Sequence, residues 1–176
     1  VFVSSQNDKI YAFNLPTPFT LKGISYIAGS ETALAENFDF NADGTKLFTI
    51  PDTTANQILK EFTLDNAYDI TSSTLVRSTD LSSIIDSNAD SNANDVPKSL
   101  MFSKDGSMMF VLLITNFNQT AQNFTFTDMI FQFKLAVPFD TSTLRLAGSS
   151  VVTSGFHDGS GSNTFDYTQG FAISPN

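Results

Sequence analysis

The sequence contains no cysteine and a single histidine, His157. Without cysteine there is no disulfide framework, no thiolate nucleophile and no thiolate metal site. One histidine excludes a zinc site built from several histidines and leaves one candidate general base. Asp158, Ser160 and Ser162 lie close to it in the sequence, but neighbours in one glycine-rich loop do not make a catalytic triad. We therefore expect a loop histidine without a special role.

Basic residues are also scarce, and long apolar runs are absent. Nine Lys and Arg oppose 18 Asp and Glu, which gives a formal net charge of −9. This charge repels a phosphate backbone, so nucleic acid is not expected as a partner. The longest apolar run, Met108–Ile114, is far shorter than the roughly 18 to 20 residues that span a bilayer. It predicts a buried central strand, and no membrane insertion is expected.

Hydrophobic residues are plentiful and follow an internal repeat. The segment Asn37–Ile50 reads NFDFNADGTKLFTI, and Ser99–Leu112 reads SLMFSKDGSMMFVL. Four positions coincide at one constant spacing, with Phe40, Asp43, Gly44 and Phe48 matching Phe102, Asp105, Gly106 and Phe110. Glycine supplies the positive φ that a tight turn needs, so Asp-Gly between two apolar strands predicts a β-hairpin.

A second pattern recurs after the first. It reads IYAFNLPTPF at residues 10–19, LKEFTLDNAYD at 59–69 and IFQFKLAVPFD at 130–140. The alternation of apolar and polar residues predicts a half-buried strand followed by a turn. Asp69 and Asp140 come directly after the aromatic residue of this turn. We expect their carboxylates to accept hydrogen bonds from backbone amides of the turn.

Together these patterns predict units of four antiparallel strands with almost no helix. The second strand would resemble Lys46–Ile50, and the fourth would lie near Thr74–Arg77 or Thr143–Ala147. The alternative of a short helical turn remains open for residues Thr79–Ile85. Thr115–Asp128 would be a long loop between the second and third strands. The predicted divisions are a partial unit 1–36, units 37–98 and 99–168, and the first strand of another unit at 169–176.

The aromatic residues of these strands are the predicted core. Large aromatic side chains bury much apolar area where two sheets pack face to face. The predicted core residues are Phe2, Phe13, Phe40, Phe48, Phe62, Phe102, Phe110, Phe133 and Phe171.

At FSKDGSMMFV and PFDTST (Phe102–Val111 and Pro138–Thr143), the sequence resembles β-propeller repeats. The first motif is similar to blades of lactonase-like propellers. The second is similar to a repeat in large surface proteins of marine bacteria and in phage virion proteins. The resemblance implies an all-β fold of four-stranded antiparallel blades, about three of them, whereas closed propellers have about 4 to 8. It also implies that the chain is part of a larger propeller, or that another copy completes its open edges.

A polar segment offers one candidate metal site. Asp86, Asn88 and Asp90 match the opening of a calcium-binding loop. Ser91 replaces the usual glycine, and Pro97 stands where the bidentate glutamate belongs. A calcium site and a solvated linker between units both remain open.

Two further candidate sites are N-glycosylation sequons, at Asn118 and Asn123. They have meaning only in a secreted protein from a cell that glycosylates such sequons.

The favoured function is a non-catalytic structural or binding segment of an extracellular, cell-surface or virion-surface protein. Adhesion, receptor contact or assembly would use the inserted loops, and the partner would be a protein or glycan surface or further copies of the chain. One alternative is a lactonase- or glycosidase-like hydrolase with a metal or paired carboxylates. Another is a subunit that assembles with itself into a ring or filament. No catalytic residue or cofactor other than calcium is expected.

Overall fold

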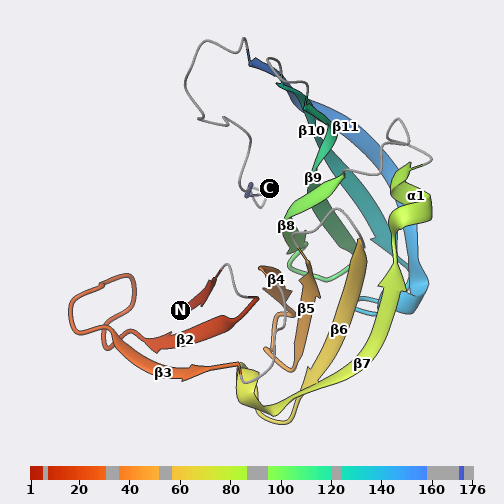
Figure 1. The fold of residues 1–176 in the computed structure, drawn as a ribbon. Coiled ribbons are helices and arrows are strands. Elements are labelled where there is room, and N and C mark those ends of the chain that lie inside the picture. The colour runs from red at the N-terminus through yellow and green to blue at the C-terminus, as the bar shows by residue number, and fades with distance from the viewer. Residues whose placement is uncertain are drawn as a thin grey trace.

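The computed structural model describes residues 1–5, 8–30, 36–51, 57–86, 95–119, 124–157 and 171–172. These residues form three antiparallel sheets that follow one another in chain order, so the predicted all-β class is confirmed. The sheets lie along an arc (Figure 1), with β4 and β8 on its inner side and β7 and β11 on its outer side. Strands β4 and β8 are in contact across successive sheets.

Each sheet is a simple meander. The first sheet contains β1 (Phe2–Ser4), β2 (Ile10–Asn14) and β3 (Ser25–Gly29). The second contains β4 (Asn37–Phe40), β5 (Lys46–Ile50), β6 (Ile58–Leu64) and β7 (Ser73–Asp80). The third contains β8 (Val96–Phe102), β9 (Met108–Gln119), β10 (Phe124–Leu135) and β11 (Leu144–His157). Two 3-10 turns, η1 (Ile70–Ser72) and η2 (Thr141–Thr143), precede β7 and β11, and the helix α1 (Ser82–Asp86) follows β7.

The repeat predicted from the sequence is confirmed in the strand register. Leu47 pairs with Phe62 in the second sheet, and Met109 pairs with Phe133 in the third. In the first sheet the Phe13 N–H donates to Val1 O at 2.8 Å, which places β1 in the position that β5 and β9 occupy. The first sheet therefore contains the equivalents of the last three strands of the others.

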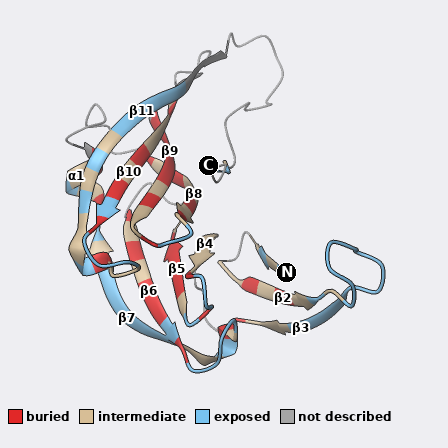
Figure 2. Ribbon diagram, turned by 180° about the vertical axis from the view of Figure 1, so that it is seen from behind, coloured by how far each residue is buried: buried red, intermediate tan, exposed pale blue. Residues whose placement is uncertain are grey.

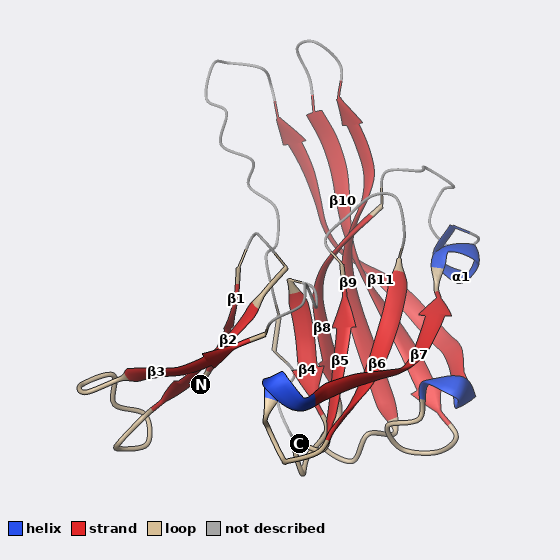
Figure 3. Ribbon diagram, turned by 60° about the horizontal axis from the view of Figure 1, so that its bottom comes forward, coloured by secondary structure: helices blue, strands red, loops and turns tan. Residues whose placement is uncertain are grey.

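One predicted loop is instead a long hairpin. We expected a loop at Thr115–Asp128, but β9 continues to Gln119 and β10 begins at Phe124. The strands stay paired there, with Thr115 opposite Thr127 and the Thr115 hydroxyl donating to Thr127 O at 3.1 Å. Threonine and phenylalanine favour extended backbone, and this outweighs the polar character of the segment. The hairpin projects beyond the strands of the second sheet (Figure 3).

The last strand is also longer than predicted. Instead of ending near Ala147, β11 runs to His157, which pairs with Phe124 of β10. His157 therefore ends a strand and is not in a loop, so that expectation was wrong; its side chain lies outside the described residues. The predicted helical turn corresponds to α1, whose Ile85 is fully buried.

The core lies between successive sheets. Figure 2 shows buried residues concentrated in the middle strands of the second and third sheets, whereas β7 and β11 are largely exposed. Of the predicted core residues, Phe48, Phe62, Phe102 and Phe133 are buried. Five others are only partly buried, namely Phe2, Phe13, Phe40, Phe110 and Phe171. Phe131 is fully buried and was not predicted.

Both Asp-Gly turns have the predicted geometry. Gly44 has φ 72° and Gly106 has φ 71°, the left-handed region that favours glycine. An aromatic ring from the turn after the third strand lies directly on each glycine. A Cβ added to Gly44 would lie 2.4 Å from the Tyr68 ring, and one added to Gly106 would lie 2.2 Å from the Phe139 ring. A side chain larger than hydrogen at these positions would force the ring to move.

Aspartates stabilise the turns as predicted. Asp69 Oδ1 accepts from the Thr71 N–H at 3.1 Å, and Asp140 Oδ1 accepts from the Ser142 N–H at 2.9 Å. Asp43 and Asp105 bond in the same way to the residue two positions later. Hydroxyl and amide donors hold the pKa of all four carboxyl groups below the ordinary value.

We predict that Gly106→Ala lowers the free energy of unfolding by at least about 1 to 2 kcal/mol, because alanine must adopt positive φ and displace the Phe139 ring. Gly148→Ala is the matched control, since a Cβ there meets nothing within 4 Å. Urea denaturation followed by circular dichroism measures both. Equal effects of the two substitutions would contradict the close approach of ring and glycine.

A second prediction concerns acid stability. The lowered pKa values of Asp43 and Asp105 mean that the folded state binds fewer protons than the unfolded state, so stability falls as pH drops below about 4. Replacing both by asparagine keeps an acceptor oxygen but removes the titration. The double variant should lose less stability than the unmodified chain between about pH 5 and pH 2.5. Denaturant titrations across this pH range test the prediction, and parallel curves would refute it.

Candidate functional site

Where two sheets meet, three aromatic rings form what we call the aromatic joint. Between the second and third sheets it consists of Phe48, Phe102 and Phe139, with ring centroids 4.3 to 6.2 Å apart. The joint between the first and second sheets uses the equivalent positions Phe2, Phe40 and Tyr68, at 4.7 to 6.3 Å. The same three places in the repeat therefore connect each sheet to the next.

A buried charge network accompanies the joint between the second and third sheets. Glu61 is 3% exposed. Its Oε1 accepts from Lys46 Nζ at 2.7 Å, and its Oε2 accepts from the Thr141 hydroxyl at 2.7 Å. Arg77 Nε lies 3.8 Å from Oε2. Both carboxylate oxygens of Glu61 therefore have hydrogen-bond partners from neighbouring strands and turns.

The inner strands of these two sheets are also hydrogen-bonded. Asp39 Oδ2 accepts from the Phe102 N–H at 2.7 Å, and Asn37 Nδ2 donates to Pro97 O at 3.0 Å. Burial raises the pKa of Asp39, while amide donors from Phe102 and Phe40 partly offset this effect. These contacts fix the position of β8 against β4.

The joint between the first and second sheets lacks the charge network. Ala12 pairs with Ala28 across β2 and β3, just as Glu61 pairs with Arg77 across β6 and β7. Ile70 replaces Thr141 as the residue that packs against the preceding sheet. Two alanines therefore stand where the other joint has two long side chains, and space remains between the sheets.

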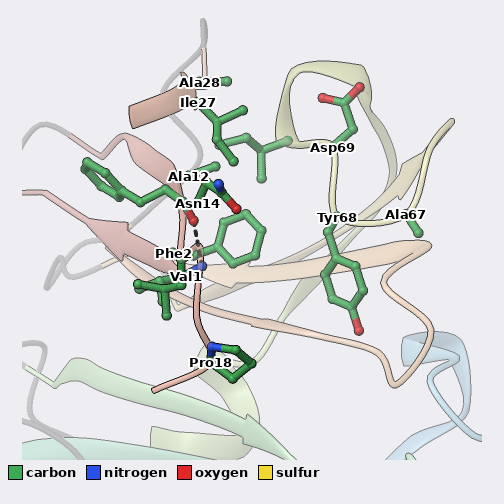
Figure 4. A pocket seen from close by; sticks show the side chains of 13 residues that line it. Val1, Phe2, Ala12, Asn14, Pro18, Ile27, Ala28, Ala67, Tyr68 and Asp69 are labelled. Carbon is green, nitrogen blue, oxygen red and sulfur yellow. Dashed lines mark hydrogen bonds between the residues drawn. The ribbon is translucent and has the colours of Figure 1, made fainter. Parts of the chain in front are cut away.

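This space is an open hollow of about 520 Å³. Figure 4 shows its walls, which come from the first sheet on one side and from the turn before η1 on the other. The lining residues are Val1, Phe2, Ala12, Phe13, Asn14, Leu15, Pro18, Ile27, Ala28, Ala67, Tyr68, Asp69 and Ile70. Pockets that bind ligands are mostly apolar with a few polar groups and have volumes of about 300 to 1,000 Å³. We take this hollow as the candidate functional site.

The chemistry of the hollow suits binding. Asp69 is the one carboxylate among the lining residues that the structure describes. Its Oδ1 accepts from the Thr71 hydroxyl at 2.6 Å, and this contact lowers the pKa of Asp69. The Tyr68 hydroxyl donates to Ala42 O at 3.1 Å. The walls present aromatic and aliphatic surface together with the amide of Asn14.

Most of the site residues predicted from the sequence lie outside the hollow. Asp86 ends α1, while Asn88 and Asp90 lie outside the described residues. Pro97, placed at the end of the proposed calcium loop, belongs to β8. Within the part of the chain that the structure describes, no group of three or more His, Asp or Glu side chains is placed to hold a metal ion. Calcium binding remains a prediction.

The two sequons also remain untested. Asn118 lies in β9, opposite Thr125 of β10, and its side chain is not described. Asn123 lies outside the described residues.

The sequence reasoning missed the charge network and the hollow. The signal that could have found them lies directly before the phenylalanine that the repeat places in each third strand. This position differs among the three copies, where it is Ala12, Glu61 or Gln132. Strand alternation alone does not identify it, because Glu61 and its neighbour Phe62 are both buried.

No helix in the described residues is long and apolar enough to cross a membrane. No protein-family model matches the sequence, and a search of curated proteins gives no match.

We predict that Glu61→Ala destabilises the protein by about 2 to 3 kcal/mol, because the buried Thr141 hydroxyl loses its acceptor and Lys46 loses its carboxylate partner, keeping only Phe139 O. The double variant Lys46→Met/Glu61→Leu should recover at least half of this loss, since no charge of that pair is then left without its partner. Urea denaturation of the three proteins measures the difference. A harmless Glu61→Ala substitution would contradict the role of the network.

Proposed function

We propose that the chain is a non-catalytic structural and binding segment of the β-propeller type, in which each sheet corresponds to one blade. The observation that carries this proposal is the aromatic joint, built twice from the same three repeat positions. A joint that recurs at constant positions allows sheets to be added side by side, as in repeat architectures whose units contact only their neighbours.

The carboxyl groups within and beside the joints support a structural role. Glu61 is bonded to Lys46 and Thr141, and Asp39 is bonded to two backbone amides. Asp69 and Asp140 are bonded to their own turns. These hydrogen bonds connect neighbouring sheets or hold single turns, which is the role expected of polar groups in a structural repeat.

The hydrolase alternative finds less support. Glycosidases use two carboxyl groups about 5 to 9.5 Å apart across a cleft. Among the described residues that line the hollow, Asp69 is the one carboxylate, so they provide no such pair. No observation on the described residues favours lactone or glycoside hydrolysis over binding.

We propose the hollow as the contact site for a protein or glycan surface. Its apolar walls fit an aliphatic side chain or the apolar face of a sugar ring, and Asn14 and Asp69 supply polar partners at the edge. Display at a cell surface, in the extracellular space or on a virion follows from the sequence resemblance alone and stays a prediction.

We predict that the purified chain binds members of a panel of surface polysaccharides and surface proteins, and that Ala28→Leu weakens this binding at least tenfold by filling the hollow. The measurements are array binding followed by biolayer interferometry, with urea denaturation to show that the variant folds. The matched control replaces residues 116–126 by Asn-Gly between Thr115 and Thr127, which removes the projecting hairpin and should leave the affinity unchanged.

Two results would overturn this proposal. Loss of binding on removal of the hairpin, with Ala28→Leu unaffected, would move the contact site to the inserted segment. Turnover of lactones or oligosaccharides, tested with and without calcium, in the absence of any binding to the panel would favour the enzyme.

A further inference from the structure

Arg77 of β7 spans the joint between the second and third sheets. Its Nη2 lies 3.8 Å from Asp140 Oδ1, in the turn that precedes β11. Its Nε lies 3.8 Å from Glu61 Oε2, in the third strand of the second sheet. The guanidinium group of one residue therefore connects the turn aspartate of one sheet to the sheet before it.

The joint between the first and second sheets repeats the backbone of this arrangement. Asp69 caps η1 as Asp140 caps η2, and each carboxylate accepts from the N–H two residues later. The turn η1 contacts β3, and the turn η2 contacts β7. Asp69 therefore stands beside the first sheet as Asp140 stands beside the second.

Ala28 stands at the position of Arg77. It pairs with Ala12 as Arg77 pairs with Glu61, and each pair lies directly before a bulge at the same place in its sheet. A methyl group thus takes the place of a long cationic side chain. The turn aspartate that such a cation would meet is still present, as Asp69.

The hollow lies between these two positions. Ala28 is on the wall formed by the first sheet, and Asp69 is on the facing wall (Figure 4). The volume of about 520 Å³ exceeds that of one arginine side chain. None of the lining residues that the structure describes is lysine, arginine or histidine. A ligand that brings its own cation could therefore approach Asp69 as Arg77 approaches Asp140.

The charge of the site is complementary to such a ligand. Hydrogen bonds from Thr71 lower the pKa of Asp69, so its carboxyl group is ionised at neutral pH. For Asp140, hydrogen bonds from Ser142 lower the pKa, and the charge of Arg77 lowers it further. The net charge of −9 would also attract a basic partner to the chain.

The walls of the hollow favour a guanidinium group over an ammonium group. Phe2 and Tyr68 contribute aromatic rings whose centroids lie 6.3 Å apart. A guanidinium group is planar, weakly hydrated and stacks on aromatic rings, whereas an ammonium group is compact and strongly hydrated. Ala12, Ile27 and Ile70 offer apolar surface for the aliphatic part of an arginine side chain.

We propose that the hollow binds the guanidinium group of an arginine side chain from a partner protein, beside Asp69 and in the place that Arg77 takes in the other joint. This inference rests on the proposed function of the hollow as a contact site, and it names the group that the hollow recognises. Because Ala12 stands in the place of Glu61, the guanidinium group meets one carboxylate instead of two.

The probe for this proposal is Nα-acetyl-arginine-N-methylamide, a capped arginine, titrated into the isotope-labelled chain and followed by amide NMR spectra. We expect a dissociation constant in the millimolar range, because one solvent-accessible ion pair contributes little free energy. The largest shifts should occur at Ile27, Ala28 and Ile70. The capped citrulline, which has nearly the same shape but no charge, should bind at least about fivefold more weakly.

Two aspartate variants form a matched pair. Asp69→Asn should weaken binding of the capped arginine at least about fivefold, because the ion pair is lost. Asp140→Asn removes the same charge from the equivalent turn and should leave binding unchanged. In both variants the amide oxygen can still accept from the N–H of the turn. Urea denaturation shows whether the two variants fold.

A third variant supplies the cation from within the chain. Ala28→Arg should place a guanidinium group beside Asp69 and abolish binding of the capped arginine, while urea denaturation confirms that the variant folds. Undiminished binding to a folded Ala28→Arg variant would show that the probe binds elsewhere, and it would overturn the proposal.

Equal binding of the arginine and citrulline probes, or equal effects of the two aspartate variants, would also overturn the proposal. So would a glycan that occupies the hollow and is not displaced by the capped arginine. A protein partner that loses affinity in Ala28→Leu but not in Asp69→Asn would refute guanidinium recognition and leave the hollow as the contact site. The two proposals therefore fail separately.

Discussion

The close approach of an aromatic ring to a turn glycine is the contact on which the rest of the structure depends. Phe139 covers Gly106 and Tyr68 covers Gly44, which ties the first hairpin of each sheet to the turn that follows its third strand. The same rings also contact the phenylalanines of the joint, including one from the preceding sheet. Aromatic pairs contribute about 0.5 to 1.5 kcal/mol beyond their buried area. One ring therefore couples the folding of a sheet to its packing against a neighbour.

The turn aspartates explain part of the acidic composition without reference to any ligand. Asp43 and Asp105 hold the turn below each ring, and Asp69 and Asp140 hold the 3-10 turn beside it. In each case the donors come from within the same turn, and they stabilise the ionised form. An acidic sequence is thus a poor guide to metal or cation binding in a repeat that uses carboxylates to hold its own turns.

The local structure could be predicted from the sequence to a large extent, because it depends on neighbouring residues. Alternation located β5 and β6, and the Asp-Gly turns and the aspartate hydrogen bonds followed from local chemistry. The site could not be predicted in this way. The contact between Glu61 and Thr141 joins residues 80 positions apart, and the hollow depends on which side chains meet across two sheets. The hairpin at Thr115–Asp128 was wrongly predicted as a loop because its polar residues masked its alternation.

The three copies of the repeat differ at the positions that form the charge network, and several of these positions differ together. A buried carboxylate is tolerated only when cations and hydrogen-bond donors surround it, so Glu61 requires Lys46, Arg77 and Thr141 together. Where the first sheet has Ala12, it also has Ala28 in place of the arginine, and Ile70 takes the place of the threonine. Without Glu61, Arg77 would keep only Asp140, 3.8 Å away, as a charged partner among the described residues. The hollow therefore lies where Ala12, Ala28 and Ile70 stand in the places of Glu61, Arg77 and Thr141, and its apolar walls follow from these three residues.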